Sequence, residues 1–461
     1  VGGRGGTLRH LGGAALWLLA LALLLTARVG PALAEVVAAR EPVVILLSFD
    51  GVRHDYLDRG DLPALERMAR EGARAEALVP VFPSSTFPSH VSLATGARVE
   101  THGIVGNHFL DPELGTFHYE DDARFLRAEP LWVAAERQGV RAATFFWVMA
   151  QSDWRGMGPS LRRAPFDSDI DEAEKVEQIL AWLDRPPAER PRLVMSWWHG
   201  ADHAGHRFGP DDSRTTDQLR GQDEALSALL AGLDARDACA TTTLPVVSDH
   251  GMAAIADTVD AEAALAATGI DARIVRGGPV AHVHLQDPGR ASEALRVLAG
   301  LPDVRAWLAD RVPARLRYRV PDRTGDVVAL LSPPRIFGSR ALGARLRRAL
   351  AGSSGAHGYD PAEVATMHGI LLAKGRGVPA GRRLPRQQAL DVAPTVARLL
   401  GIDAPRQAEG EPIDALLEGL ARPPAGTHAA HEHAADERAT LEAHPLRGGP
   451  AHVPGRSSGR P

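Results

Sequence analysis

An aspartate and a threonine in the N-terminal part of the chain have the surroundings that a metal-assisted reaction needs. Asp50 comes directly after an apolar, β-branched segment, residues 43–47, which predicts a buried parallel strand that ends in a carboxylate. Thr86 lies between prolines at positions 83 and 88, which restrict the backbone just before the apolar segment 91–94. A hydroxyl group held beside a strand-end carboxylate suggests a nucleophile that a metal ion activates.

Carboxylate and imidazole groups recur in three later clusters, each beside a predicted strand. The first cluster is Asp202 with His206, which are four residues apart, so they share one face of the chain if that stretch is helical. Each cluster alone is more often structural than metal-binding. The clusters are Asp202 with His206, Asp249 with His250, and His357 between two glycines. All three clusters are expected at the strand ends of one sheet. Together with Asp50 and Thr86, they predict a metal-binding active site.

These residues need a sheet to position them, and the pattern of the chain predicts one. Apolar strands alternate with helices, which is typical of an α/β fold with a mostly parallel central sheet and helices on both faces. Strands are expected at 43–47, 142–147, 193–198, 245–248 and 370–373. Helices are expected at 61–70 with Asp61 as the N-cap, and at 131–138, 170–183, 211–233 and 387–400.

Composition divides the chain into parts with different expected roles. Residues 1–34 have a basic start, an apolar run and a small-x-small pattern, so we expect a cleaved signal peptide rather than a membrane anchor. Residues 35–421 are expected to form the catalytic domain, with 259–345 as an inserted smaller α+β subdomain. Residues 422–461 are rich in Pro, Gly, Ala and His, which predicts a disordered tail. His428, His431 and His433 in this tail offer at most a weak metal site.

Charge and cysteine content limit the classes of function. The formal net charge of -5 provides no basic surface of the kind that polynucleotide recognition needs. Cys239 is the sole cysteine, so no disulfide can form within the chain although an exported protein meets an oxidising compartment. We therefore expect a periplasmic or secreted protein with a small-molecule substrate and no membrane span after signal cleavage. The sequence carries no signal for an oligomeric state.

Six motifs give the chain a resemblance to a known family. From residue 43 to residue 402 it resembles the nucleotide pyrophosphatase/phosphodiesterase family of the alkaline phosphatase superfamily, in motif order and spacing. The motifs are FDGVRHDYL, TFPSH, HGIVGNHF, DHAGHRFGP, SDHGM and GAHGYDP. The resemblance implies an alkaline-phosphatase-like fold and a hydrolase of phosphodiester or pyrophosphate bonds, with two zinc ions and a covalent phospho-threonine intermediate.

The resemblance also implies the ligands of both zinc ions. Oxygen and imidazole ligands suit zinc, and three carboxylates with a threonine alkoxide balance the charge of two divalent ions. Two metals would stabilise the attacking and the leaving oxygen of an in-line displacement. One zinc ion would lie on Asp202, His206 and His357, and the other on Asp50, Asp249, His250 and the Thr86 oxygen.

Four residues around the nucleophile take further roles by the same resemblance. Thr86 would be the nucleophile, and Asn107 would donate a hydrogen bond to a phosphoryl oxygen. Phe87 and Trp147 match positions that wall the leaving or the retained group of the substrate. The chain departs from the family at Ser89, where Asn is usual, and in the tryptophan-containing segment 197–201. Both departures bear on substrate preference.

Alternatives within and outside the superfamily remain open on the sequence. A sulfatase would need a C/S-x-P-x-R motif, which is absent around Thr86. A phosphomonoesterase needs an added cation over its dianionic substrate, and we expect no arginine there, because Arg53 and Arg98 have the pattern of surface charges. A non-catalytic periplasmic metal-binding protein is the alternative from a different class. The favoured substrate is a phosphodiester or a nucleotide.

Overall fold

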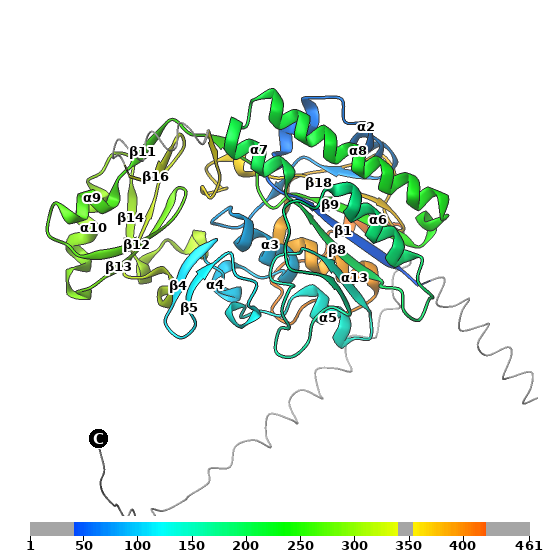
Figure 1. Ribbon diagram of the computed structural model, residues 1–461, viewed down its shortest axis with the longest axis horizontal. Helices are drawn as coiled ribbons and strands as arrows, with labels where there is room; N and C mark the ends of the chain where they lie inside the picture. Colours follow the sequence, from blue (N-terminus) through cyan, green and yellow to red (C-terminus); the bar gives the residue numbers. More distant parts are fainter. Residues whose placement is uncertain (1–40, 340–353, 421–461) are drawn as a thin grey trace, which may run out of the picture. The chain divides into compact units, whose positions relative to one another are not determined.

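The computed structural model describes residues 41–339 and 354–420, and its centre is a sheet of eight strands (Figure 1). The strand order is β19-β2-β18-β9-β1-β8-β6-β7. Every residue of the central strand β1 is buried, as its continuous apolar sequence predicts. The strands are β1 (Val43–Phe49), β2 (Ala73–Ala75), β6 (Ala142–Phe145), β7 (Leu161–Arg163), β8 (Leu193–Trp198), β9 (Thr242–Val247), β18 (Leu371–Gly375) and β19 (Arg382–Leu384).

The sheet is mostly parallel. Strands β7, β6, β8, β1 and β9 pair in parallel, and β18 alone of the eight runs the other way, antiparallel to both β9 and β2. The predicted fold class, an α/β fold with a mostly parallel central sheet, is therefore confirmed. Because β1, β8 and β9 are adjacent and parallel, the residues that follow them meet at one edge of the sheet.

Helices cover both faces of the sheet (Figure 1). One face carries α2 (Pro63–Glu71), α6 (Glu172–Leu183) and α8 (Ser213–Ala235), which pack against one another over a shared apolar core. The other face carries α3 (Thr86–Thr95), α5 (Leu131–Arg137) and α13 (Val392–Leu400). The spacing of apolar residues predicted all of these helices except α3.

Some predicted helix starts are wrong, for local reasons. The N-cap of α2 is Leu62 rather than Asp61, with Pro63 in the first turn. Helix α8 begins at Ser213, where the Asp212 side chain accepts a hydrogen bond from the amide of Arg214. The last helix begins at Val392 rather than residue 387, because Gln387–Gln388 forms a strand, β20, that pairs with β3 (Leu78–Val79).

A second sheet lies in the segment for which we predicted an inserted subdomain. Its strand order is β12-β13-β15-β14, and all pairs in it are antiparallel. It has an apolar core cluster of its own, to which α9 (Ala261–Ala266) and α10 (Ala291–Ala299) contribute. The strands are β12 (Ala272–Gly277), β13 (Val280–Leu285), β14 (Arg305–Leu308) and β15 (Val327–Leu330).

Two predictions concern residues outside the described part of the chain: the signal peptide at 1–34 and the tail at 422–461. A search of the described residues finds no helix long and apolar enough to cross a membrane.

Candidate metal centre and active site

Thr86 is the first residue of α3, with Ser85 as the N-cap, and its side chain is buried. The Thr86 Oγ1 atom is 3.3 Å from Nε2 of His250, which follows β9. The N-terminus of a helix carries a partial positive charge and free amide groups, so it favours an anionic group beside it. The two prolines that flank Thr86 in the sequence thus mark a helix start.

Thr86, Asp50, Asp249 and His250 converge on one point. Besides the Thr86 hydroxyl, His250 Nε2 lies 3.1 Å from Asp249 Oδ2 and 3.4 Å from Asp50 Oδ1. Asp50 follows β1, and Asp249 and His250 follow the adjacent parallel strand β9, so the parallel pairing of these strands produces this convergence. We call Asp50, Asp249 and His250 site A; their ligand atoms lie within 4.8 Å of one another.

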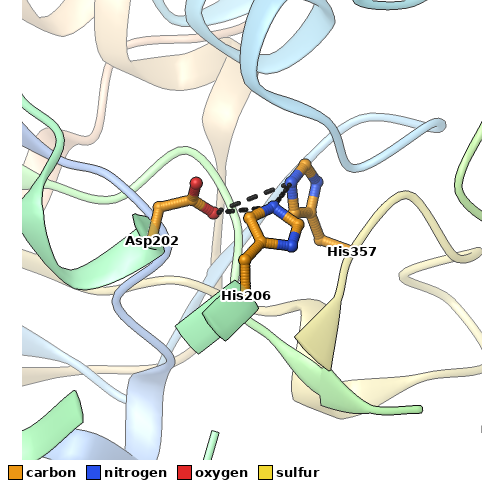
Figure 2. Close-up of side chains that lie close together, drawn as sticks. All are labelled: Asp202, His206 and His357. Carbon is orange, nitrogen blue, oxygen red and sulfur yellow. Dashed lines mark hydrogen bonds and ion pairs between the residues drawn. The ribbon is translucent and has the colours of Figure 1, made fainter. Parts of the chain in front are cut away.

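Asp202, His206 and His357 form a second group, site B, which Figure 2 shows. Asp202 and His206 lie on α7 (Gly200–Phe208), so the predicted helical turn brings them to one face. His206 Nε2 is 3.5 Å from Asp202 Oδ1, and His357 Nε2 is 3.6 Å from the same oxygen. His357 follows the short strand β17 (Gly355–Ala356), and its ring stacks on that of His250, so sites A and B are adjacent.

Three histidines of sites A and B, His206, His250 and His357, have their tautomers fixed by the hydrogen bond that Nδ1 makes. The Nδ1 atoms are 2.8 to 3.1 Å from backbone carbonyl oxygens, which can only accept. Each Nδ1 therefore carries the proton, and each Nε2 presents a lone pair to the site. The Nε2 atoms of His206 and His357 are 3.0 Å apart. Two lone pairs at that separation repel unless a cation or a proton lies between them.

Buried carboxylate oxygens provide a test of whether cations fit here. Among the described residues, Asp50 Oδ1, Asp202 Oδ1 and Asp249 Oδ2 are buried and lack a hydrogen-bond partner. Burial, together with the neighbouring carboxylates, raises the pKa of Asp50 and of Asp249 well above the usual range. Burial lowers the pKa of His250 to about 3, so this imidazole cannot neutralise them. Oxygen and neutral imidazole donors with uncompensated charge fit divalent cations such as zinc.

Asn107 lies beside Thr86. Its Oδ1 accepts a hydrogen bond of 2.9 Å from the amide of Phe87, the residue after Thr86. This bond fixes the orientation of the amide group, so Nδ2 is its donor end and makes a long hydrogen bond of 3.5 Å to the Tyr119 hydroxyl. Asn107 therefore offers a neutral donor next to Thr86.

The two predicted aromatic wall residues lie in different surroundings. The Phe87 ring is buried in edge contacts with Phe117 and Tyr119. The Trp147 ring is completely buried and packs edge-on against His90. Neither residue lines the cavity beside site B. The exposed aromatic rings near the site are Tyr119 and Phe166, at 50% and 37% exposure.

A cavity of about 150 Å³ adjoins site B, between the main sheet and the second sheet. His206, His357 and Asn107 line it from one side, and Arg276 and His282 of the second sheet line it from the other. The turn between β12 and β13 packs on the His357 loop so closely that a Cβ atom at Gly278, with φ +62°, would lie 3.0 Å from the His357 carbonyl oxygen. The second sheet thus forms one wall of the candidate active site.

Three residues at the site were missed by sequence reasoning. His90 Nδ1 lies 2.9 Å from the Thr86 carbonyl oxygen and 3.2 Å from Asp249 Oδ2, and so connects helix α3 to site A. Trp197 Nε1 donates a hydrogen bond to Asp50. Arg276 lines the cavity, which corrects the expectation that no arginine lies near the site. His90 lies in the TFPSH motif, and Trp197 lies in segment 197–201, which departs from the family pattern, so the sequence could have pointed to both. Arg276 lies in none of the six motifs.

The expectation for Arg53 was also wrong. Its side chain is buried rather than on the surface, and it forms ion pairs with Asp55 at 2.6 Å and Asp211 at 3.1 Å. Arg98, by contrast, is partly exposed and forms an ion pair with Glu409, as a surface charge does.

Comparison with known proteins gives a consistent result. Residues 44–360 match the family model described as type I phosphodiesterase/nucleotide pyrophosphatase. The chain is 28% identical over 366 residues to the bis(5'-adenosyl)-triphosphatase of Xenopus laevis, covering 78% of each chain. It is 28% identical over 394 residues to the venom phosphodiesterase of Naja atra, covering 81% of this chain and 46% of that one. It spans about half the length of several such curated relatives, including one from Caenorhabditis elegans at 47%.

Solved structures agree with the sequence comparison. Murine ectonucleotide pyrophosphatase/phosphodiesterase 5 superposes with a TM-score of 0.72 at 26% identity, covering 79% of this chain and 96% of that one. An inactive threonine-to-alanine variant of the murine protein in complex with AMP gives 0.73 at 25% identity, covering 82% and 99%. The family model covers more than half of the chain, residues 44–360. The chain therefore belongs to the type I phosphodiesterase/nucleotide pyrophosphatase family.

Proposed function

We propose that this protein is a periplasmic or secreted two-zinc hydrolase of phosphodiester or pyrophosphate bonds that acts through a covalent phospho-threonine at Thr86. The observation that carries the proposal is that Thr86 Oγ1 and two buried carboxylates, of Asp50 and Asp249, converge on the unprotonated Nε2 of His250. Site B lies directly beside it. The names of the relatives and the AMP complex of the murine protein support a nucleotide substrate.

Each residue of the site has a separate role in the proposed reaction. Thr86 Oγ1 attacks phosphorus, the bond from phosphorus to the leaving oxygen breaks, and water later releases the phosphoryl group from Thr86. Asn107 Nδ2 and the N-terminus of α3 favour the negative charge on the non-bridging oxygens. Zinc ions at sites A and B would lower the pKa of the threonine hydroxyl and stabilise the leaving oxygen. Asp50, Asp249 and His250 would hold one ion, and Asp202, His206 and His357 the other.

A diester is expected to be a better substrate than a monoester. A monoester dianion needs more positive charge over its free oxygens, whereas the donor next to Thr86 is the neutral Asn107. Arg276 keeps its positive charge, but the Glu262 carboxylate at 3.5 Å and the solvent around its 36% exposed side chain weaken the effect of that charge on a substrate dianion. The measurement is kcat/KM for p-nitrophenyl thymidine 5'-monophosphate against p-nitrophenyl phosphate. We expect a ratio of about 100 or more.

An equal or faster rate with the monoester would contradict the diester prediction and favour a phosphatase. If purified wild-type protein with bound zinc hydrolyses neither ester nor a nucleoside triphosphate, the protein is the non-catalytic alternative.

Arg276 is expected to matter only when the leaving group is charged. Thr86 faces site A, so an in-line leaving group departs toward site B and the cavity that Arg276 lines. Thymidine 5'-triphosphate and p-nitrophenyl thymidine 5'-monophosphate would give the same thymidylyl-threonine, with pyrophosphate or nitrophenolate as the leaving group. Arg276→Gln should lower kcat/KM for the triphosphate about tenfold, the scale of one hydrogen bond to a charged group, and leave the aryl ester unchanged.

The matched control for Arg276 is Arg273→Gln on the same strand. The Arg273 side chain reaches the Thr116 hydroxyl, and Arg273 is not among the residues that line the cavity. This variant should leave both substrates unaffected. Equal losses for both substrates in the Arg276 variant would show that Arg276 supports the fold of the second sheet and does not bind the leaving group.

A further inference from the structure

Trp197 contacts site A through the carboxylate of Asp50. Its indole Nε1–H donates a hydrogen bond of 2.8 Å to Asp50 Oδ2. The strand register explains this contact, because β8 is the parallel neighbour of β1 and Trp197 is paired with Ser48. The Asp50 amide in turn donates to the Trp198 carbonyl oxygen at 2.9 Å. Both the backbone and the side chain of Asp50 are therefore fixed by the end of β8.

The hydrogen bond separates the two oxygens of Asp50. Oδ2 is taken by the indole, whereas Oδ1 is buried, has no hydrogen-bond partner in the described chain and lies 3.4 Å from His250 Nε2. An indole N–H is a donor only: it cannot bind a cation and does not titrate. It therefore holds the carboxylate in one orientation without competing for the oxygen that faces site A.

The indole is itself held on several sides. Phe166 stacks on it with ring centroids 5.0 Å apart, and His90 packs against it at 5.6 Å. The Trp197 carbonyl oxygen accepts a hydrogen bond of 3.2 Å from Nζ of Lys175, which is completely buried. Rotation of the indole away from Asp50 would break the two ring contacts, and the bond from Lys175 holds the backbone of Trp197, so the donor is preorganised.

We propose that Trp197 is a positioning residue that orients Asp50 and thereby sets the affinity of site A for its divalent cation. This inference rests on the proposed metal centre. Residues that hydrogen-bond a metal ligand typically change metal affinity about 10- to 100-fold when they are removed. Because Trp197 touches site A and not the ligands of site B, the effect is confined to one of two ions.

The test is Trp197→Phe, which keeps an aromatic ring and removes the N–H donor. Trp198→Phe is the matched control, because Trp198 is the next residue of the same strand, is completely buried and donates to Ser196 Oγ at 3.1 Å, away from both sites. Zinc affinity is measured by competition with a chromophoric chelator, with full-length protein. In Trp197→Phe we expect one of the two dissociation constants to rise about 10- to 100-fold and the other to stay at the wild-type value. Trp198→Phe should change neither.

Each other outcome has a distinct meaning. Wild-type affinity for both ions in Trp197→Phe overturns the inference, and so does an equal loss in Trp198→Phe, which would show general damage to β8. Melting of both zinc-free variants checks that they fold to a similar extent. A wild-type protein that binds no zinc would instead overturn the proposed metal centre itself.

Discussion

Replacement of Thr86 by alanine is expected to lower turnover by about 10⁴-fold or more, the scale seen when other catalytic nucleophiles are removed. The variant loses the attacking oxygen but keeps the three carboxylates and three imidazoles of sites A and B. Zinc content should therefore stay near two ions per chain. Hydrolysis of p-nitrophenyl thymidine 5'-monophosphate and metal analysis of the same preparation measure both quantities.

Two further variants make the Thr86 result specific. Thr86→Ser keeps a hydroxyl group at the start of α3 and should retain part of the activity. Ser89 was expected to bear on substrate preference, but its hydroxyl is completely buried on the same helix and has no hydrogen-bond partner in the described chain, so Ser89→Ala should keep wild-type turnover of this substrate. If Thr86→Ala keeps a tenth of wild-type turnover, water attacks phosphorus directly and Thr86 is not the nucleophile.

The proximity of some of these carboxylates and imidazoles could be predicted from sequence because local rules place them together. Asp50 and Asp249 end apolar segments, and parallel strands bring such ends to one edge of a sheet. Asp202 and His206 are one helical turn apart, so a helix suffices to aim both at one point. His357 was a candidate from its place between two glycines, but only the family resemblance grouped it with Asp202 and His206, because its approach to them depends on a loop far along the chain.

The remaining contacts depend on tertiary placement. Trp197 reaches Asp50 because β8 pairs with β1 in one register, and a shift by one residue would place its side chain on the other face of the sheet. Arg276 enters the cavity because the turn after β12 packs on the His357 loop. Trp147 has an aromatic side chain at a motif position, yet it is completely buried against His90. Residue type and spacing carry no information on such long-range packing.

Removal of metal is expected to abolish activity and to lower the melting temperature together. Without a cation, the buried Asp50 Oδ1, Asp202 Oδ1 and Asp249 Oδ2 have no hydrogen-bond partner among the described residues, and the Nε2 atoms of His206 and His357 face each other at 3.0 Å. An ion that binds only the folded chain stabilises it by about 2.7 kcal/mol at a free concentration 100 times the dissociation constant. Dialysis against EDTA followed by thermal melting and activity assays measures the loss, and added zinc should restore both.

The effect of metal should grow with pH, for a reason that the carboxylates provide. In the metal-free protein, burial and mutual repulsion raise the pKa of Asp50 and of Asp249, so the folded chain keeps protons that the unfolded chain has lost above its ordinary pKa near 3.8. The metal-free protein therefore loses stability as pH rises from that value through the raised pKa of the folded state. Zinc requires the ionised carboxylates, so protons compete with it at low pH. The zinc-dependent rise in melting temperature should thus be larger at pH 8 than at pH 5, whereas activity that survives exhaustive chelation would rule out the metal-assisted mechanism.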